Sequence, residues 1–288
     1  MISLSFIFLT LAIIILWPAQ AGKTSLIQYS WLFLLLISIL FGLNDGTLEP
    51  LALLPVIAFT ALVVPFHQTS GVVRLIFASA IVALALALGL HILPGFHNPV
   101  VISDVRLAND SLPYTLQLNY DKALAGLFLL WLSRPLLHKP GNILLMIKQS
   151  APIALLTIGL VIALSLLLDY IRLDMKLPTF FYYWLWANLF FTCVAEEALF
   201  RGFLQQQISL GLINIRHGAF AALIICAVLF GLAHAGGGMI YVILATVAGV
   251  GYGAVFLRTG RIEASILLHF MLNTVHILFF SYPALQNT

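Results

Sequence analysis

Long apolar stretches dominate this chain and constrain its fold more than any other feature. Hydrophobic residues make up 62% of its 288 residues and charged residues only 8%, whereas a soluble globular chain carries about a quarter charged residues. A helix needs about 20 mostly apolar residues to cross a bilayer. Ten such stretches follow one another, at 2–17, 26–43, 48–66, 72–93, 123–138, 151–168, 179–200, 217–235, 238–257 and 262–281. The sequence therefore predicts an all-α fold, a polytopic transmembrane helical bundle of about ten spans.

The third stretch differs from the others because Pro50 and Pro55 interrupt it. Proline removes a backbone donor and bends a helix, although membrane helices tolerate it where neighbours satisfy the backbone groups that lose their partners. We expect this segment to be kinked or to enter the membrane only part of the way.

Basic residues divide unevenly between the two sides of the predicted bundle. If the N-terminus lies outside, the inner loops hold nine of the thirteen basic residues: Lys23, Arg74, Arg134, Lys139, Lys148, Arg201, Arg216, Arg258 and Arg261. The outer loops hold Arg106, Lys122, Arg172 and Lys176, together with seven of the ten acidic residues. Since cytoplasmic loops carry the excess of Lys and Arg, we expect a multi-pass protein of the bacterial inner membrane with both termini outside.

The end of the first stretch, Ala19-Gln20-Ala21-Gly22, resembles a signal-peptidase site. Cleavage there would remove one helix. No basic region precedes the stretch and Lys23 follows it directly, so we expect the helix to be retained.

Charge and cysteine content disfavour two kinds of partner. The net charge is only +3 and the basic residues are scattered over the loops, so the chain lacks the basic stripe of a nucleic-acid-binding protein. Cys193 and Cys226 each lie inside an apolar stretch, which fits neither a disulfide framework nor a CxxC motif. We expect both to be small buried residues.

Ionisable side chains gather in the distal apolar region of the chain. They are Glu196, Glu197, Arg201, His234, His269 and His276, with Asn273 as a polar neighbour. Placing such a group in a membrane costs free energy, so each is a candidate for function whose partner must be found.

Two adjacent glutamates continue the seventh stretch as helix. Glu197 lies four residues before Arg201, the favourable order for an ion pair along a helix, which predicts a structural pair. Glu196 is rotated by about 100° from Glu197 at ~3.6 residues per turn. Arg201 therefore cannot serve both carboxylates equally, and Glu196 is available as a general base or acid.

The three histidines differ in position. His234 lies near the end of its predicted helix, and His269 and His276 lie on the last predicted helix. His234 precedes three glycines and can be an acid–base group or metal ligand, or a histidine satisfied at the membrane interface. His269 and Asn273 are four residues apart, on one face of the last stretch. That spacing suits a metal site, a donor pair for an oxyanion or hydrogen bonding between helices. For His276, nearer the outer end, we favour hydrogen bonding between helices.

Three motifs occur in order in these stretches: EExxxR at 196–201, FxxxH at 230–234 and HxxxN at 269–273. Together they resemble the CPBP family of intramembrane peptidases, also called the Abi or CAAX-protease family, which includes the type II CAAX prenyl endopeptidases. The resemblance covers about residues 180–280. It implies an intramembrane endopeptidase that hydrolyses a membrane-associated peptide or protein.

The resemblance also implies a role for each motif residue. Glu196 would activate the attacking water with help from His234, and His269 and Asn273 would stabilise the oxyanion at the scissile carbonyl. Members of the family have also been described as zinc proteases with the same glutamate and histidines as ligands, here Glu196, His234 and His269. The sequence lacks the HExxH helix that usually supplies such a site, so we expect no metal cofactor.

Supporting roles follow from the same resemblance. Glu197 and Arg201 would hold the site together, and Phe230 would pack beside it. We expect residues 1–150 to form N-terminal transmembrane helices without a motif, and residues 151–288 to form the peptidase core.

A polar outer loop near residues 94–121 lies in the N-terminal part. It could gate the substrate or simply connect two helices, and we favour the connector.

Other functions compete with a peptidase. GxSG, GxGD and HExxH motifs, which would indicate other protease chemistries, do not occur. A transporter would also place charges in the membrane, but such folds usually have duplicated halves, and here the polar groups lie in the distal third. A non-catalytic binding or immunity protein on the same scaffold would keep the motifs. Neither the substrate, prenylated or not, nor the oligomeric state can be deduced from these residues.

Overall fold

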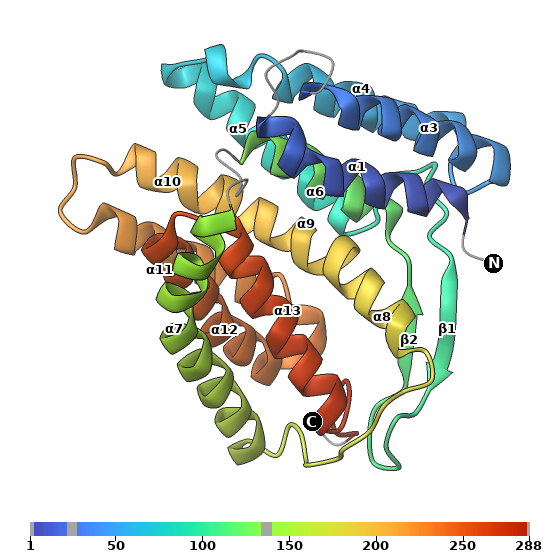
Figure 1. The fold of residues 1–288 in the computed structure, drawn as a ribbon, viewed down its shortest axis with the longest axis vertical. Helices are drawn as coiled ribbons and strands as arrows, with labels where there is room; N and C mark the ends of the chain where they lie inside the picture. Colours follow the sequence, from blue (N-terminus) through green and yellow to red (C-terminus); the bar gives the residue numbers. More distant parts are fainter. Residues whose placement is uncertain (1–2, 22–27, 134–139, 287–288) are drawn as a thin grey trace. The chain divides into compact units, whose positions relative to one another are not determined.

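The computed structural model describes residues 3–21, 28–133 and 140–286 and is mostly helical (Figure 1). The α-helices are α1 (Leu4–Ala21), α3 (Ser30–Asp45), α4 (Leu53–Val63), α5 (Gly71–Gly89), α6 (Tyr120–Leu132), α7 (Pro140–Leu167), α8 (Phe181–Ala187), α9 (Val194–Glu197), α10 (Gln206–Gly211), α11 (Gly218–Leu232), α12 (Gly238–Thr259) and α13 (Ile262–Phe279). Helix occurs within every one of the predicted apolar stretches. The prediction of a helical fold is therefore confirmed.

Contacts divide the chain into two compact units that alternate along the sequence. Unit 1 comprises residues 1–99, 118–138 and 190–203, and unit 2 comprises residues 100–117, 139–189 and 204–288. We predicted a single boundary near residue 150 from the positions of the motifs, whereas these units are defined by contacts and each comprises several segments. The predicted boundary stays a prediction.

Aromatic rings form much of the core of unit 1. Phe6 of α1 meets Tyr120 of α6 edge-on, with ring centroids 5.6 Å apart. Phe59 of α4 stacks on Phe128 of α6 at 5.1 Å between centroids. Ser38 of α3 donates a hydrogen bond of 2.6 Å to a backbone carbonyl at the start of α1. Helix α6 thus contacts several other helices of this unit, and its position is fixed by packing.

The third predicted stretch consists of three successive helical segments, and neither of the two prolines interrupts them. A 3₁₀ turn at Pro50–Ala52 precedes α4, and a second 3₁₀ turn at Phe66–Gln68 follows it. Pro55 lies in the first turn of α4, where the missing N–H of proline has no partner to lose. The expectation that Pro55 interrupts the helix was therefore wrong, and α4 instead ends ahead of Pro65.

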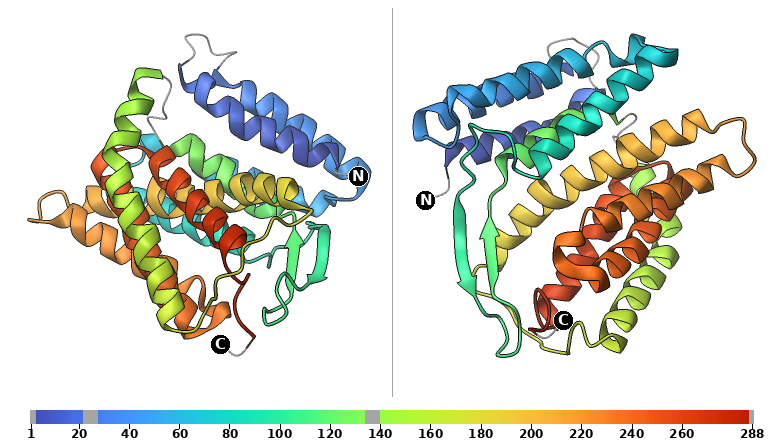
Figure 2. Two further views of the ribbon diagram at one scale, coloured as in Figure 1. Left: turned by 60° about the horizontal axis from the view of Figure 1, so that its bottom comes forward. Right: turned by 180° about the vertical axis from the view of Figure 1, so that it is seen from behind.

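Helices α7, α11, α12 and α13 form the body of unit 2, and two further views show them from other directions (Figure 2). Tyr170, which follows α7, packs in a buried cluster with Leu244 of α12 and Phe280 after α13. Gly260 ends α12 in the left-handed conformation, at φ 64°, and its N–H bonds to the Phe256 carbonyl. Glycine adopts this conformation without a steric cost, so α13 can begin directly after a tight turn.

An antiparallel hairpin of β1 (Val100–Val105) and β2 (Tyr114–Gln117) occupies part of the predicted outer loop. Tyr114 stacks near Phe180, with ring centroids 6.1 Å apart, and meets Tyr282 edge-on at 5.0 Å. The hairpin is therefore anchored to the chain before α8 and after α13. Our expectation of a plain connector missed this structured element.

Several helices of the described chain can cross a membrane by length and composition. Five stretches qualify: Pro50–Gln68, Gly71–Gly89, Ile143–Leu167, Ala235–Thr259 and Ile262–Phe279. Leu4–Ala19, Ser30–Asp45 and Gly218–Leu232 are apolar but shorter. Large apolar side chains such as Val72 and Leu155 are more than 70% exposed, as expected for a surface that faces lipid. The chain is an integral membrane protein, although the number of ten spans is not confirmed.

Four residues used in the sequence analysis lie outside the described part of the chain. They are Gly22 of the expected cleavage site and the basic residues Lys23, Arg134 and Lys139. Cys193 and Cys226 lie within it, and both are buried as predicted.

Candidate active site

Glu197 and Arg201 form the ion pair that their spacing predicts. Arg201 Nη1 donates to Glu197 Oε1 at 3.0 Å, and neither side chain is exposed to any extent. Removing one partner of a buried pair leaves an uncompensated charge. This pair therefore has a structural role within unit 1.

Glu196 also has a charged partner, which the sequence analysis did not foresee. Lys122 Nζ lies 2.6 Å from Glu196 Oε1, with the two side chains 20% and 13% exposed. We had placed Lys122 in an outer loop, but α6 begins at Tyr120 and includes it. Glu196 thus has an ionic partner that the spacing of residues 196–201 does not reveal.

The helix that carries the two glutamates changes its winding on both sides of them. The short α9 lies between π-helical segments at Asn188–Cys193 and Ala198–Gln205. Such wide turns are rare and frequently occur at functional sites. We found no sequence signal that would have predicted them.

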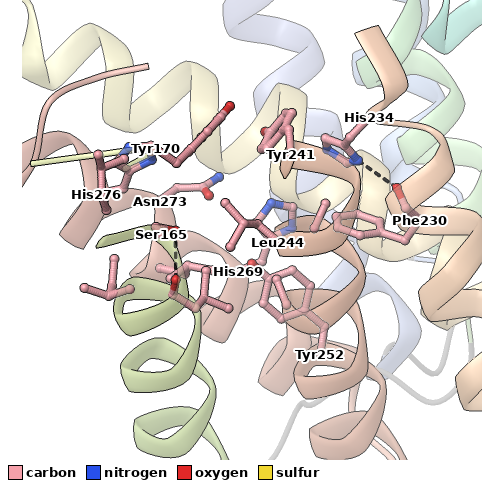
Figure 3. A pocket seen from close by; sticks show the side chains of 16 residues that line it. Ser165, Tyr170, Phe230, His234, Tyr241, Leu244, Tyr252, His269, Asn273 and His276 are labelled. Carbon is pink, nitrogen blue, oxygen red and sulfur yellow. Dashed lines mark hydrogen bonds between the residues drawn. The ribbon is translucent and has the colours of Figure 1, made fainter. Parts of the chain in front are cut away.

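The histidines and asparagine of the other two motifs line one pocket of unit 2 (Figure 3). His234 comes from the turn after α11, and His269 and Asn273 come from one face of α13. The pocket has about 80 Å³ of room for water-sized groups, and one water needs only ~10–15 Å³ on that measure. Water can therefore reach these three side chains together.

A hydrogen bond and aromatic contacts orient His234. Its Nδ1 lies 2.7 Å from the carbonyl oxygen of Phe230, so Nδ1 carries a proton and donates. In the neutral ring Nε2 then has the acceptor lone pair. The Phe230 ring packs 4.6 Å from that of His234 and 5.8 Å from that of His269. Phe230 therefore packs beside both histidines, as the resemblance implied.

His269 is held between aromatic rings and is only 4% exposed. Its imidazole stacks on Tyr252, with centroids 4.7 Å and planes 17° apart. Tyr252 lies on α12, and its backbone carbonyl accepts a hydrogen bond of 2.8 Å from Ser265 of α13. These contacts fix the plane of the imidazole within the pocket.

Asn273 has a polar neighbour that the sequence analysis missed. Its Nδ2 lies 3.4 Å from Oδ1 of Asn188, at the start of the first π-helical segment. The signal was present in the sequence, because Asn188 is an amide in the middle of an apolar stretch. This contact orients the side-chain amide of Asn273.

His276 also lines the pocket, and its contacts are structural. Its Nε2 lies 3.2 Å from the carbonyl oxygen of Ser281, and its ring meets that of Tyr282 edge-on. For His276 we had favoured a hydrogen bond between helices, but this bond joins it to the segment that follows its own helix α13.

The fit to a zinc ion can be examined within each unit. A catalytic zinc site takes three protein ligands. In the residues described, neither unit brings together three His, Cys, Asp or Glu side chains at metal-binding distances, and the pocket of unit 2 is lined by neither a carboxylate nor a thiol. The groups of one unit alone therefore do not fit a zinc site.

The structure thus brings three of the four proposed catalytic residues into one pocket. His234, His269 and Asn273 share it in unit 2, whereas Glu196 lies in unit 1 beside Lys122.

Fold and site together define a class of protein: a helical membrane protein with a water-accessible histidine and asparagine pocket. Residues 178–275 match the model of the family described as type II CAAX prenyl endopeptidase Rce1-like. This region, about a third of the chain, is similar to the CPBP or CAAX-protease family. The comparisons with curated proteins and with solved structures gave no match.

Proposed function

We propose that this chain is an intramembrane endopeptidase that uses an activated water and no metal. The similarity of residues 178–275 to a family of endopeptidases supports this reaction class. The observation that carries the mechanism is that His234, His269 and Asn273 line one pocket with room for water.

In the proposed reaction, Glu196 and His234 remove a proton from water as its oxygen attacks the scissile carbonyl carbon. His269 and Asn273 donate hydrogen bonds to the oxyanion that forms, a type of stabilisation that often contributes most to such reactions. The carbon–nitrogen bond then breaks, and the proton taken from water passes to the leaving amine. One peptide bond and one water give a carboxylic acid and an amine.

The local geometry supports these roles. The bond from His234 Nδ1 to a backbone carbonyl fixes the tautomer in which Nε2 can accept a proton. The stacked ring of His269 and the contact between Asn273 and Asn188 hold two donors in set directions. Preorganised donors lower the barrier because they need no rearrangement during the reaction.

The substrate that we propose is a peptide or membrane protein, and it does not need to be prenylated. Comparative proteomics of membranes from a deletion strain and from a strain with Glu196→Ala would identify it. We expect the same uncleaved membrane proteins in both strains.

We also propose about ten spans and an inner-membrane location, which cysteine accessibility along the loops would test.

Purified protein in detergent tests the catalytic roles directly. We expect His234→Ala and His269→Ala each to abolish cleavage of a peptide substrate while the unfolding temperature stays near that of the wild type. A chelator should leave the wild-type rate unchanged, and metal analysis should find no stoichiometric zinc. Loss of activity in chelator with recovery on adding zinc would favour the zinc mechanism instead. Full activity in both histidine variants would favour a different site.

A further inference from the structure

We propose that Lys122 is a positioning residue that holds the carboxylate of Glu196 for the reaction. This inference rests on the proposed function. Lys122 lies outside residues 178–275, the region that matches the family. It therefore adds to the site a residue from a part of the chain in which the sequence analysis found no motif.

The contact between Lys122 and Glu196 is short and largely shielded from solvent. Nζ and Oε1 are 2.6 Å apart, and the side chains are only 20% and 13% exposed. In such surroundings opposite charges attract more strongly than at an open surface, because less water screens them. The ammonium therefore stabilises the negative charge of the carboxylate and restricts its rotation.

Helix packing brings the two residues together. Lys122 and Gly126 are four residues apart on α6 and share one face. A Cβ atom at Gly126 would lie only 2.6 Å from Cα of Ala195, the residue before Glu196. The absence of a side chain at Gly126 lets α6 approach α9 closely, which places the lysine side chain within reach of the carboxylate.

Side chains of Asn98, which precedes α6, and of Asp121, within it, fix the first turn of the helix. Asn98 Oδ1 accepts the N–H of Tyr120 at 2.8 Å, and Asp121 Oδ1 accepts the N–H of Lys122 at 2.8 Å. Asp121 is itself held by Asn98 at 3.0 Å and by His91 at 2.8 Å, and it is only 1% exposed. These bonds satisfy N–H groups that a helix start leaves without partners. These hydrogen bonds therefore hold the backbone of Lys122 in place.

A carboxylate has two oxygens and several acceptor positions. Lys122 can therefore anchor Oε1 while the carboxylate retains capacity to accept a proton from water. Holding a reacting group in its productive direction lowers the barrier without tightening substrate binding. The expected signature of losing Lys122 is therefore a lower kcat at an unchanged KM.

Three variants of the full-length protein test this role in detergent. Lys122→Met keeps the length of the side chain without its charge, and we expect kcat to fall about ten- to a hundredfold. Lys122→Arg keeps the charge and should recover most of the rate. Lys176→Met is the matched control, because Lys176 pairs with Asp174 at the same distance of 2.6 Å and is also partly buried. We expect this control to keep the wild-type kcat.

A kcat for Lys122→Met equal to that of the control would overturn the inference. An equal loss in Lys122→Arg and Lys122→Met would also overturn it, since the charge would then not matter.

A second measurement does not depend on cleavage. We expect Lys122→Met to lower the unfolding temperature less in a Glu196→Gln background than in the wild type, because the ion pair is already lost there. Equal shifts in both backgrounds would show that the pair does not form. If the unfolding temperatures show that Lys122 and Glu196 interact but the wild type cleaves no peptide, the proposed function is wrong and the ion pair is still supported.

Discussion

The imidazole of His269 lies flat against the ring of Tyr252, with 4.7 Å between their centroids and 17° between their planes. Tyr252 is fully buried on α12, and His269 lies on α13. This stack fixes the plane of a donor that we assign to the oxyanion. The orientation of the donor therefore depends on the packing of two helices and not only on the motif residue itself.

Tyr252→Leu should lower kcat about tenfold, because an aromatic pair contributes roughly 0.5–1.5 kcal/mol beyond its buried area. Tyr252→Phe keeps the ring and should retain most of the wild-type rate. Steady-state cleavage by both variants checks this expectation. A larger loss in Tyr252→Phe than in Tyr252→Leu would show that the hydroxyl matters and the stack does not.

Arg201→Met should destabilise the fold by about 3–5 kcal/mol, because it leaves the buried carboxylate of Glu197 without its counter-charge. Adding Glu197→Gln should recover part of that loss, since the buried charge is then removed as well. Thermal unfolding in detergent measures both variants. Equal stability of Arg201→Met and the wild type would contradict a structural role for the pair.

Gly126→Ala should destabilise the protein by about 1–3 kcal/mol, the usual range for overpacking. The added Cβ would lie 2.6 Å from backbone Cα of Ala195, so α6 and α9 must separate. We also expect slower cleavage, because Lys122 moves with α6. Gly159→Ala on α7 is the control, since a Cβ there meets no atom within 4 Å. Similar effects from the two substitutions would argue against close packing at Gly126.

Asn188→Leu should lower kcat about threefold, in line with the ~0.6 kcal/mol typical of hydrogen bonds between membrane helices. Its amide lies 3.4 Å from that of Asn273, so the loss should be smaller than that caused by Asn273→Ala. Comparing kcat for the two variants checks this order. A greater loss for Asn188→Leu would instead give Asn188 a direct role in the reaction.

Helix positions and one ion pair could be predicted from sequence because both depend on local spacing. Apolar stretches place the helices, and the four-residue separation of Glu197 and Arg201 brings their side chains together. The pairing of Lys122 with Glu196 joins residues 74 positions apart, so it depends on tertiary packing. Our boundary for the fifth stretch, at residue 123, also left Lys122 just outside the helix that contains it.

The hairpin and the π-helical segments were missed for different physical reasons. The hairpin is held by ring contacts of Tyr114 with Phe180 and Tyr282, which are distant in sequence. The wide turns on both sides of α9 change helix winding without a change in residue type that sequence periodicity would reveal. Pro55 does not break α4, because a proline in the first turn of a helix has no hydrogen-bond partner to lose.

Single-turnover cleavage of a peptide substrate by Glu196→Gln tests most directly whether Glu196 acts as the general base. This substitution keeps the size of the side chain and removes its ability to accept a proton as a carboxylate. We predict a loss of at least about a hundredfold in the cleavage rate relative to the wild type, the scale of general base catalysis. Cleavage by Glu196→Gln at the wild-type rate would contradict it.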